Sequence, residues 1–160
     1  MNEQTTMRPF RRRRLTPAEG DLGRAIFGDQ IDIARVRLFA APLWPRAFVP
    51  NGALIVWPAA TALCDFGAAA APLRAQATFV HELTHVWQAQ RGVNLLWAKL
   101  QAGDAMAAYA YDLETGPDFA LLNIEQQAMV VEHAFLAGSG APAPYPAELY
   151  MAKLPTWRQV

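Results

Sequence analysis

Two of the three histidines in this chain lie four residues apart, in the segment His81-Glu82-Leu83-Thr84-His85. On a helix, residues with this spacing share one face, with Cβ atoms about 5–6 Å apart, so both imidazoles can reach one metal ion. Glu82 is rotated by about 100° from His81, where its carboxylate can take a proton from a metal-bound water. The H-E-x-x-H pattern therefore predicts His81 and His85 as ligands of Zn²⁺ and Glu82 as a catalytic general base.

A third ligand must come from elsewhere in the chain. Cys64 is the single cysteine, so a closed zinc site made of several cysteines is excluded, and a site with three protein ligands and one water is expected. The candidates are the downstream carboxylates and one imidazole: Asp112, Glu114, Asp118, Glu125, Glu132 and His133. Glu125 and Glu132 share a face of a predicted helix but stand about 10 Å apart along its axis, so one of the two can ligate, not both.

The alternative interpretation is that the two histidines share a helix without binding a metal ion. Their ring nitrogens would then be satisfied by ordinary hydrogen bonds. A neutral histidine pair would leave a polar pocket in the middle of the domain, which costs stability unless water fills it. We therefore favour the metal site.

The segment around the motif has the period of an amphipathic helix that begins at Pro72 and ends at Gly92. The polar face of this helix consists of Arg74, Thr78, His81, His85 and Gln88. The apolar face consists of Phe79, Leu83 and Val86. The ligands thus lie on one polar stripe of a helix that is otherwise buried.

Other elements must hold this helix in place. A capping box of Thr16 and Glu19 predicts a helix that ends near residue 27. Residues 33–43 and 47–58 are rich in β-branched and aromatic types and predict a small sheet or hairpin before the motif helix. Further helices are expected after Asn94, weakened at Gly103, and from Asn123 to Gly138. The fold class is therefore α+β, mostly helical.

The chain of 160 residues is long enough for one domain, and 53% hydrophobic with 18% charged residues indicates a globular chain. We expect a disordered basic tail over 1–14, a metal-binding domain over 15–138, and an irregular Pro-rich tail over 139–160 that packs on the domain. The first segment contains five Arg and one Glu, and the remainder is acidic, so nucleic acid is not expected as a partner. Apolar runs are too short for a membrane span.

Cellular location follows from the same features. The polar segment after the arginines lacks the apolar core of a signal peptide. A single cysteine, Cys64, suits a reducing compartment, and its apolar neighbours predict a buried thiol. We expect a cytoplasmic protein, for which delivery by a non-classical secretion route stays open.

The segments "HELTHVWQAQ", "LTPAEGDLGRAIFGD" and "YAYDLETGPDFALLNIEQQA" resemble a small family of bacterial Vgr-related proteins. These are similar to the zincin-like (gluzincin) core domain of toxins and effectors of contractile injection systems, and the resemblance covers about residues 15–137. It implies a zincin-like fold with a glutamate ligand from a later helix. In gluzincins this glutamate often begins an E-x-x-A-D pattern. The segment 125–129, "EQQAM", matches the first four positions, which implies Glu125 as the third ligand. Met129 replaces the acidic residue, so one histidine is expected to lack its orienting partner.

Two functions are compatible with these residues. The first is a zinc metallopeptidase that acts on a peptide or protein substrate, with an edge strand from "NGALIVWP" to pair with it and with His133, Tyr109 or Tyr111 as oxyanion stabiliser. The alternative is a zinc-stabilised accessory or adaptor protein of a secretion or toxin system, with a partner from that system and little or no catalysis.

Overall fold

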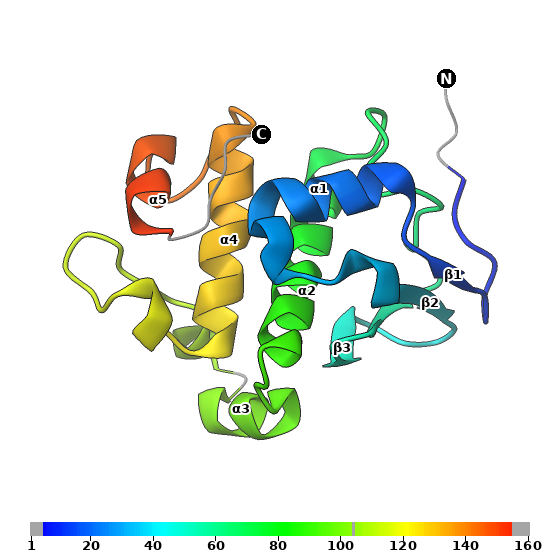
Figure 1. The fold of residues 1–160 in the computed structure, drawn as a ribbon, viewed down its shortest axis with the longest axis horizontal. Helices are drawn as coiled ribbons and strands as arrows, with labels where there is room; N and C mark the ends of the chain where they lie inside the picture. The colour runs from blue at the N-terminus through cyan, green and yellow to red at the C-terminus, as the bar shows by residue number, and fades with distance from the viewer. Residues whose placement is uncertain (1–4, 104, 155–160) are drawn as a thin grey trace.

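The structure is a computed structural model that describes residues 5–103 and 105–154. It is an α+β fold in which a small sheet lies on one side of helix α2 (Leu73–Gln90) and helix α4 (Ile124–Gly138) lies on the other (Figure 1). The remaining helices are α1 (Pro17–Phe27), α3 (Leu95–Ala102) and α5 (Ala147–Lys153). Short 3-10 turns occupy Gly28–Gln30, Ile33–Arg35, Met106–Ala108 and Phe119–Leu121.

Within the described residues, the sheet has four strands in the order β1-β2-β4-β3. They are β1 (Arg12–Arg14), β2 (Arg37–Ala41), β3 (Phe48–Asn51) and β4 (Leu54–Pro58). β2 and β4 pair in parallel, while β1 pairs with β2 and β3 with β4 antiparallel. The predicted hairpin before the motif helix is confirmed. The expectation that residues 51–58 form an edge strand is wrong, because β4 pairs with β2 on one side and with β3 on the other, and β3 is the edge strand at this end of the sheet.

The side chain of Gln90 connects the β3–β4 turn to the end of α2. Its Nε2 donates to the carbonyl of Gly52 at 2.8 Å, and its Oε1 accepts from the backbone N–H of Asp32 at 2.7 Å. A Cβ at position 52 would lie 2.8 Å from Cγ of Gln90 and 3.2 Å from its backbone nitrogen, so the turn needs glycine for this close approach. The sheet is thereby fixed against the motif helix.

The prediction of a disordered tail over 1–14 is wrong for residues 12–14, which form β1, and for Met7, which is buried and donates its backbone N–H to the carbonyl of Ala62. Residues 1–4 lie outside the described part. Arg13 donates two hydrogen bonds of 2.7 Å to the fully buried carboxylate of Glu19, and a third to the carbonyl of Leu63. Glu19 also accepts from the backbone N–H of Thr16 and of Phe66. A buried carboxylate needs a positively charged partner. Arg13, in the strand formed by the arginine run, is that partner for Glu19.

The expectation for the C-terminal segment is corrected in the same way. Residues 147–153 form α5 instead of an irregular tail, and Tyr150 is buried against α4. Tyr145 and Leu149 pack on the core, while residues 155–160 lie outside the described part. Cys64, expected to be buried, is exposed. Among the described residues, no helix is long and apolar enough to cross a membrane.

The core fixes the direction of the motif helix. Phe79 of α2 stacks on Phe66 with ring centroids 5.1 Å apart, and Trp57 of β4 lies 4.3 Å from Phe66. Val80 and Leu83 have no exposed surface. Burial of this face turns the opposite face, with both histidines, toward α4. The α2 boundaries and its apolar face agree with the sequence prediction.

Candidate metal centre

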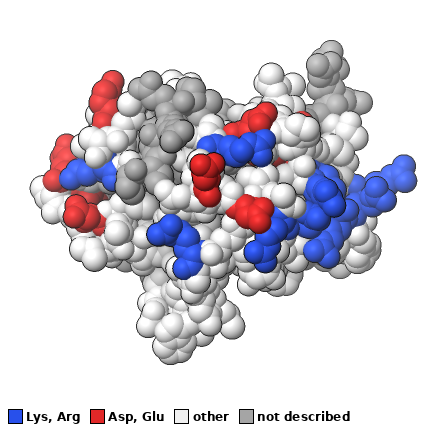
Figure 2. Space-filling view, viewed as in Figure 1, with Lys and Arg blue, Asp and Glu red and all other residues white. Residues whose placement is uncertain are grey.

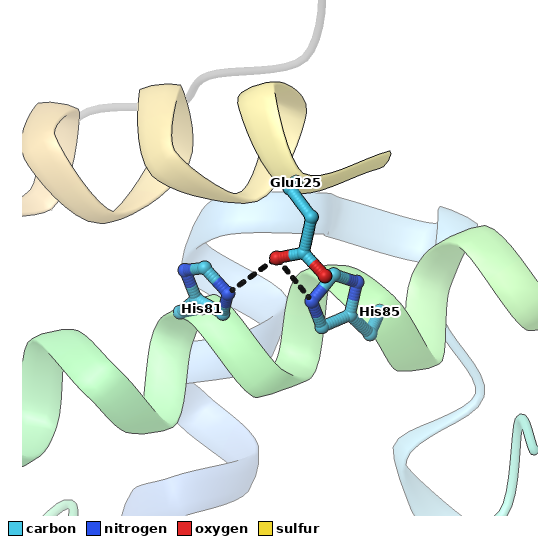
Figure 3. Close-up of side chains that lie close together, drawn as sticks. All are labelled: His81, His85 and Glu125. Atoms are coloured by element: carbon cyan, nitrogen blue, oxygen red, sulfur yellow. Dashed lines mark ion pairs between the residues drawn. The ribbon is translucent and has the colours of Figure 1, made fainter. Parts of the chain in front are cut away.

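Three metal-ligating side chains converge between α2 and α4 (Figure 3). Nε2 of His81 and Nε2 of His85 each lie 3.5 Å from Oε2 of Glu125. The three ligand atoms lie within 4.8 Å of one another, and all three side chains are at least 88% buried, their exposed fractions being 12%, 10% and 6%. Of the six candidates for the third ligand, the structure therefore brings Glu125 to the histidines.

A hydrogen-bond chain fixes the ring of His85. Its Nδ1 lies 2.8 Å from Oε1 of Gln88. The amide nitrogen of Gln88 donates to the carbonyl of Ile124 and to Oε1 of Gln127, whose own amide nitrogen donates to the carbonyl of Phe119. Both amides therefore have a determined orientation, and Nδ1 of His85 must carry the proton that Gln88 accepts. Its Nε2 faces Oε2 of Glu125 at 3.5 Å.

His81 is oriented by a carboxylate. Its Nδ1 lies 3.0 Å from Oε2 of Glu132, which favours a proton on Nδ1 and directs Nε2 to the same point as that of His85. The prediction that Met129 leaves a histidine without its partner is wrong. The carboxylate stands three residues further along α4, at Glu132, where the helix brings it over His81. Glu132 was a candidate ligand in the sequence, but its position identifies it as an orienting group.

Glu82 is buried beside this cluster, with a relative exposure of 6%. Its Oε2 has no hydrogen-bond partner among the described residues. Burial raises the pKa of Glu82, while the nearby histidines lower it. A buried carboxylate oxygen without a hydrogen-bond partner lowers the stability of the fold. Such unfavourable groups occur mainly at functional sites.

The charges at the cluster are strongly coupled. Burial alone would lower the pKa of His81, but its hydrogen bonds to Glu125 and Glu132 raise it to about 9. Burial alone would raise the pKa of Glu125, but hydrogen bonds from both histidines and from Lys99 hold it below its usual range. Without a metal ion, the three groups are thus held together by a proton on His81 at neutral pH.

The sequence did not indicate that Lys99 contacts Glu125. Its Nζ donates to Oε1 of Glu125 at 2.6 Å and to the hydroxyl of Tyr109 at 2.8 Å. No spacing pattern relates position 99 to position 125. Gln88, in contrast, stands three residues after His85 on the predicted polar stripe, so its closeness to that histidine could have been found from the sequence.

The other candidate residues lie away from the three ligands. Asp112, Glu114 and Asp118 are exposed in the loop before α4, where Asp112 bonds to the backbone of its own turn. The hydroxyl of Tyr111 lies 2.6 Å from Nδ1 of His133 and 2.7 Å from the hydroxyl of Tyr150. Burial lowers the pKa of His133.

Fold and site together define the class of this protein: an α+β domain in which two packed helices present a His-His-Glu group that could hold a metal ion. No model of a protein family matches the sequence. Over 133 residues, 78% of this chain, it is 37% identical to the type VI secretion system spike protein VgrG2b of Pseudomonas aeruginosa strain PAO1. The chain spans 13% of the length of that spike protein.

A solved structure covers nearly the whole fold. It is the effector domain of Pseudomonas aeruginosa VgrG2b, with a TM-score of 0.70 and 32% sequence identity, over 89% of this chain and 83% of that one. The chain therefore belongs to the family of the VgrG2b effector domain.

Proposed function

We propose that the chain is an effector of a secretion system and acts as a zinc-dependent metallopeptidase with a zincin-like core. The observation that carries the proposal is Glu82: a buried carboxylate with an unpartnered oxygen, one residue from His81. Folding alone gives no reason to place a carboxylate there, whereas proton transfer next to a bound metal ion requires one.

The donor set supports zinc as the metal. Two imidazole nitrogens and one carboxylate are the ligand set of catalytic sites that keep a further position for water. Gln88 and Glu132 each lie at hydrogen-bond distance from Nδ1 of one ring, so that Nε2 of both rings is turned toward Glu125, where an ion would lie. Both rings are thus prepared to bind a cation, which supports a metal site over two histidines satisfied by hydrogen bonds.

The proposed chemistry assigns one role to each group. His81, His85 and Glu125 would hold the ion, which when bound would supply an activated water and polarise the substrate carbonyl. Glu82 accepts the proton of the attacking water and passes it to the nitrogen of the leaving amine. An extended substrate would pair with the free side of β3, the edge strand next to α2.

The variant Glu82→Gln tests this role. Zinc content, measured by elemental analysis, should stay equal to that of the unmodified protein, because Glu82 is not a ligand. Cleavage of a panel of unfolded proteins should disappear, and Glu148→Gln, an exposed position on α5, should keep it. Cleavage by Glu82→Gln at the rate of the control would refute the role of Glu82.

A second function is favoured by the comparison with a spike protein: a zinc-stabilised accessory or effector domain without catalysis, with a secretion-system protein as its partner. Both functions predict bound zinc, so metal content cannot separate them. The protein panel separates them when it is incubated with the zinc-loaded domain, with and without a chelator. If no member is cleaved in a chelator-sensitive way, the accessory function replaces the peptidase.

A further inference from the structure

Helix α3 has an unusual distribution of side chains. Leu96, Trp97 and Leu100 are 74%, 61% and 68% exposed, while the lysine at position 99 faces inward on the side of the buried Leu95. In Figure 2 the lower protrusion, which corresponds to α3 in Figure 1, shows no charged side chain on the visible face. A helix stabilised by amphipathic burial has the opposite arrangement, so burial of apolar surface does not explain why Lys99 points inward.

Two of the contacts of Lys99 are with Glu125 and Tyr109. Its Nζ donates to the hydroxyl of Tyr109 at 2.8 Å and lies 5.1 Å from the centre of that ring. Asn94 caps the start of α3, with its side chain accepting from the backbone N–H of Trp97 at 3.0 Å. The ammonium group of Lys99 therefore belongs to a helix whose start is fixed by a cap.

The contact with Lys99 gives the two carboxylate oxygens of Glu125 different partners. Oε1 receives the ammonium at 2.6 Å, and Oε2 faces Nε2 of both histidines at 3.5 Å. A carboxylate whose oxygens are both available can bind a metal ion through both, which would add a fifth ligand atom beside the two imidazoles and the water and leave no free position for a further ligand. A carboxylate with one oxygen held by an ammonium offers only the other.

We propose that Lys99 is a positioning residue that limits Glu125 to a single ligand oxygen and thereby keeps one coordination position free. This proposal rests on the proposed metal site, but it does not require that the bound ion cleaves peptides. A purely structural ion pair between α3 and α4 would affect stability alone, and would leave the coordination of the ion unchanged.

Cobalt(II) is the probe that distinguishes these two roles, because its visible absorption weakens when the coordination number rises from four to five. The full chain is loaded with Co²⁺ as the unmodified protein and as Lys99→Met. We expect a weaker visible band for Lys99→Met, with Co²⁺ still bound at one ion per chain. Acetohydroxamate, which binds at a free position, should perturb the spectrum of Lys99→Met only at roughly tenfold higher concentration than that of the unmodified protein.

Two variants serve as controls. Lys153→Met removes the exposed lysine of α5 and should leave the spectrum unchanged, whereas Lys99→Arg keeps a donor and should restore most of the band. An unchanged spectrum for folded Lys99→Met overturns the proposal, as does complete loss of Co²⁺ from the folded variant, since Lys99 would then set affinity alone. If Lys99→Met does not fold, Lys99→Gln is measured with the same two outcomes.

Failure of this proposal differs from failure of the proposed function. If the domain cleaves no protein but the spectrum of Lys99→Met changes, Lys99 positions Glu125 in a site without peptidase activity. If cleavage occurs and the spectrum is unchanged, the peptidase stands and the role of Lys99 is refuted.

Discussion

The proton on His81 makes the metal-free protein sensitive to alkaline pH. The pKa of this histidine is raised from 6.5 to about 9 in the folded chain, through hydrogen bonds that the unfolded chain lacks. A raised folded pKa means that the folded state binds the proton more tightly, so the stabilisation is fully present below pH 6.5 and is lost as pH rises through about 9. One pKa unit corresponds to about 1.4 kcal/mol, which gives a loss of about 3 kcal/mol over this window.

The measurement is urea unfolding of the chelator-treated protein at pH 6.5 and at about pH 9, followed by tryptophan fluorescence. The free energy of unfolding should be lower at the higher pH by about 3 kcal/mol. Saturating Zn²⁺ should remove this difference, because a ligand nitrogen bound to a metal ion carries no proton. The variant Glu132→Ala should reduce it, since one of the two carboxylates that hold the proton is gone.

The result that refutes this reasoning is a metal-free protein whose free energies of unfolding at the two pH values agree within ~0.5 kcal/mol, which is inside the extrapolation error. The histidine would then not be held by Glu125 and Glu132 in solution. A difference of the expected size that persists unchanged in Glu132→Ala would assign it to another group.

Two further measurements test the structure. Glu132→Ala should weaken Zn²⁺ binding by about 10–100-fold in competition with a chelating dye, because His81 loses its orienting carboxylate. Glu148→Ala should bind as the unmodified protein does, and equal affinities of the two variants would remove Glu132 from the site. Glu19→Ala should lower the free energy of unfolding by roughly 3–5 kcal/mol in urea, because it leaves Arg13 without its buried partner. A loss below about 1 kcal/mol would show that β1 is held by its backbone pairing instead.

Local patterns in the sequence predicted most of the helices. The capping box of Thr16 and Glu19, the cap at Asn123 and the period around the motif place α1, α4 and α2 to within one or two residues. Caps and apolar periods act over a few residues, so their effect can be recognised without knowing the rest of the fold. The short helix α5 and the strand β1 were missed, because both depend on contacts with distant segments.

The missed strand shows why tertiary contacts decide such cases. Arginines at a chain terminus usually remain in solvent, and this expectation holds for most of the basic run. In Figure 2 its blue side chains gather on the surface around β1. Arg13 differs because the carboxylate six residues later is fully buried and accepts hydrogen bonds from Arg13 and from the backbone N–H of Phe66. That burial is a property of the assembled domain.

The sequence by itself determined that His81 and His85 share a helix face with Glu82 beside them, since helical spacing fixes these directions within one turn. Only the tertiary structure decided which carboxylate meets them. The packing of α4 on α2 brings Glu125 to the two Nε2 atoms and Glu132 to Nδ1 of His81. The position of Lys99 beside Glu125 is likewise set by packing, because the angle between two helices depends on every side chain at their interface, whereas the turn of one helix depends on its backbone.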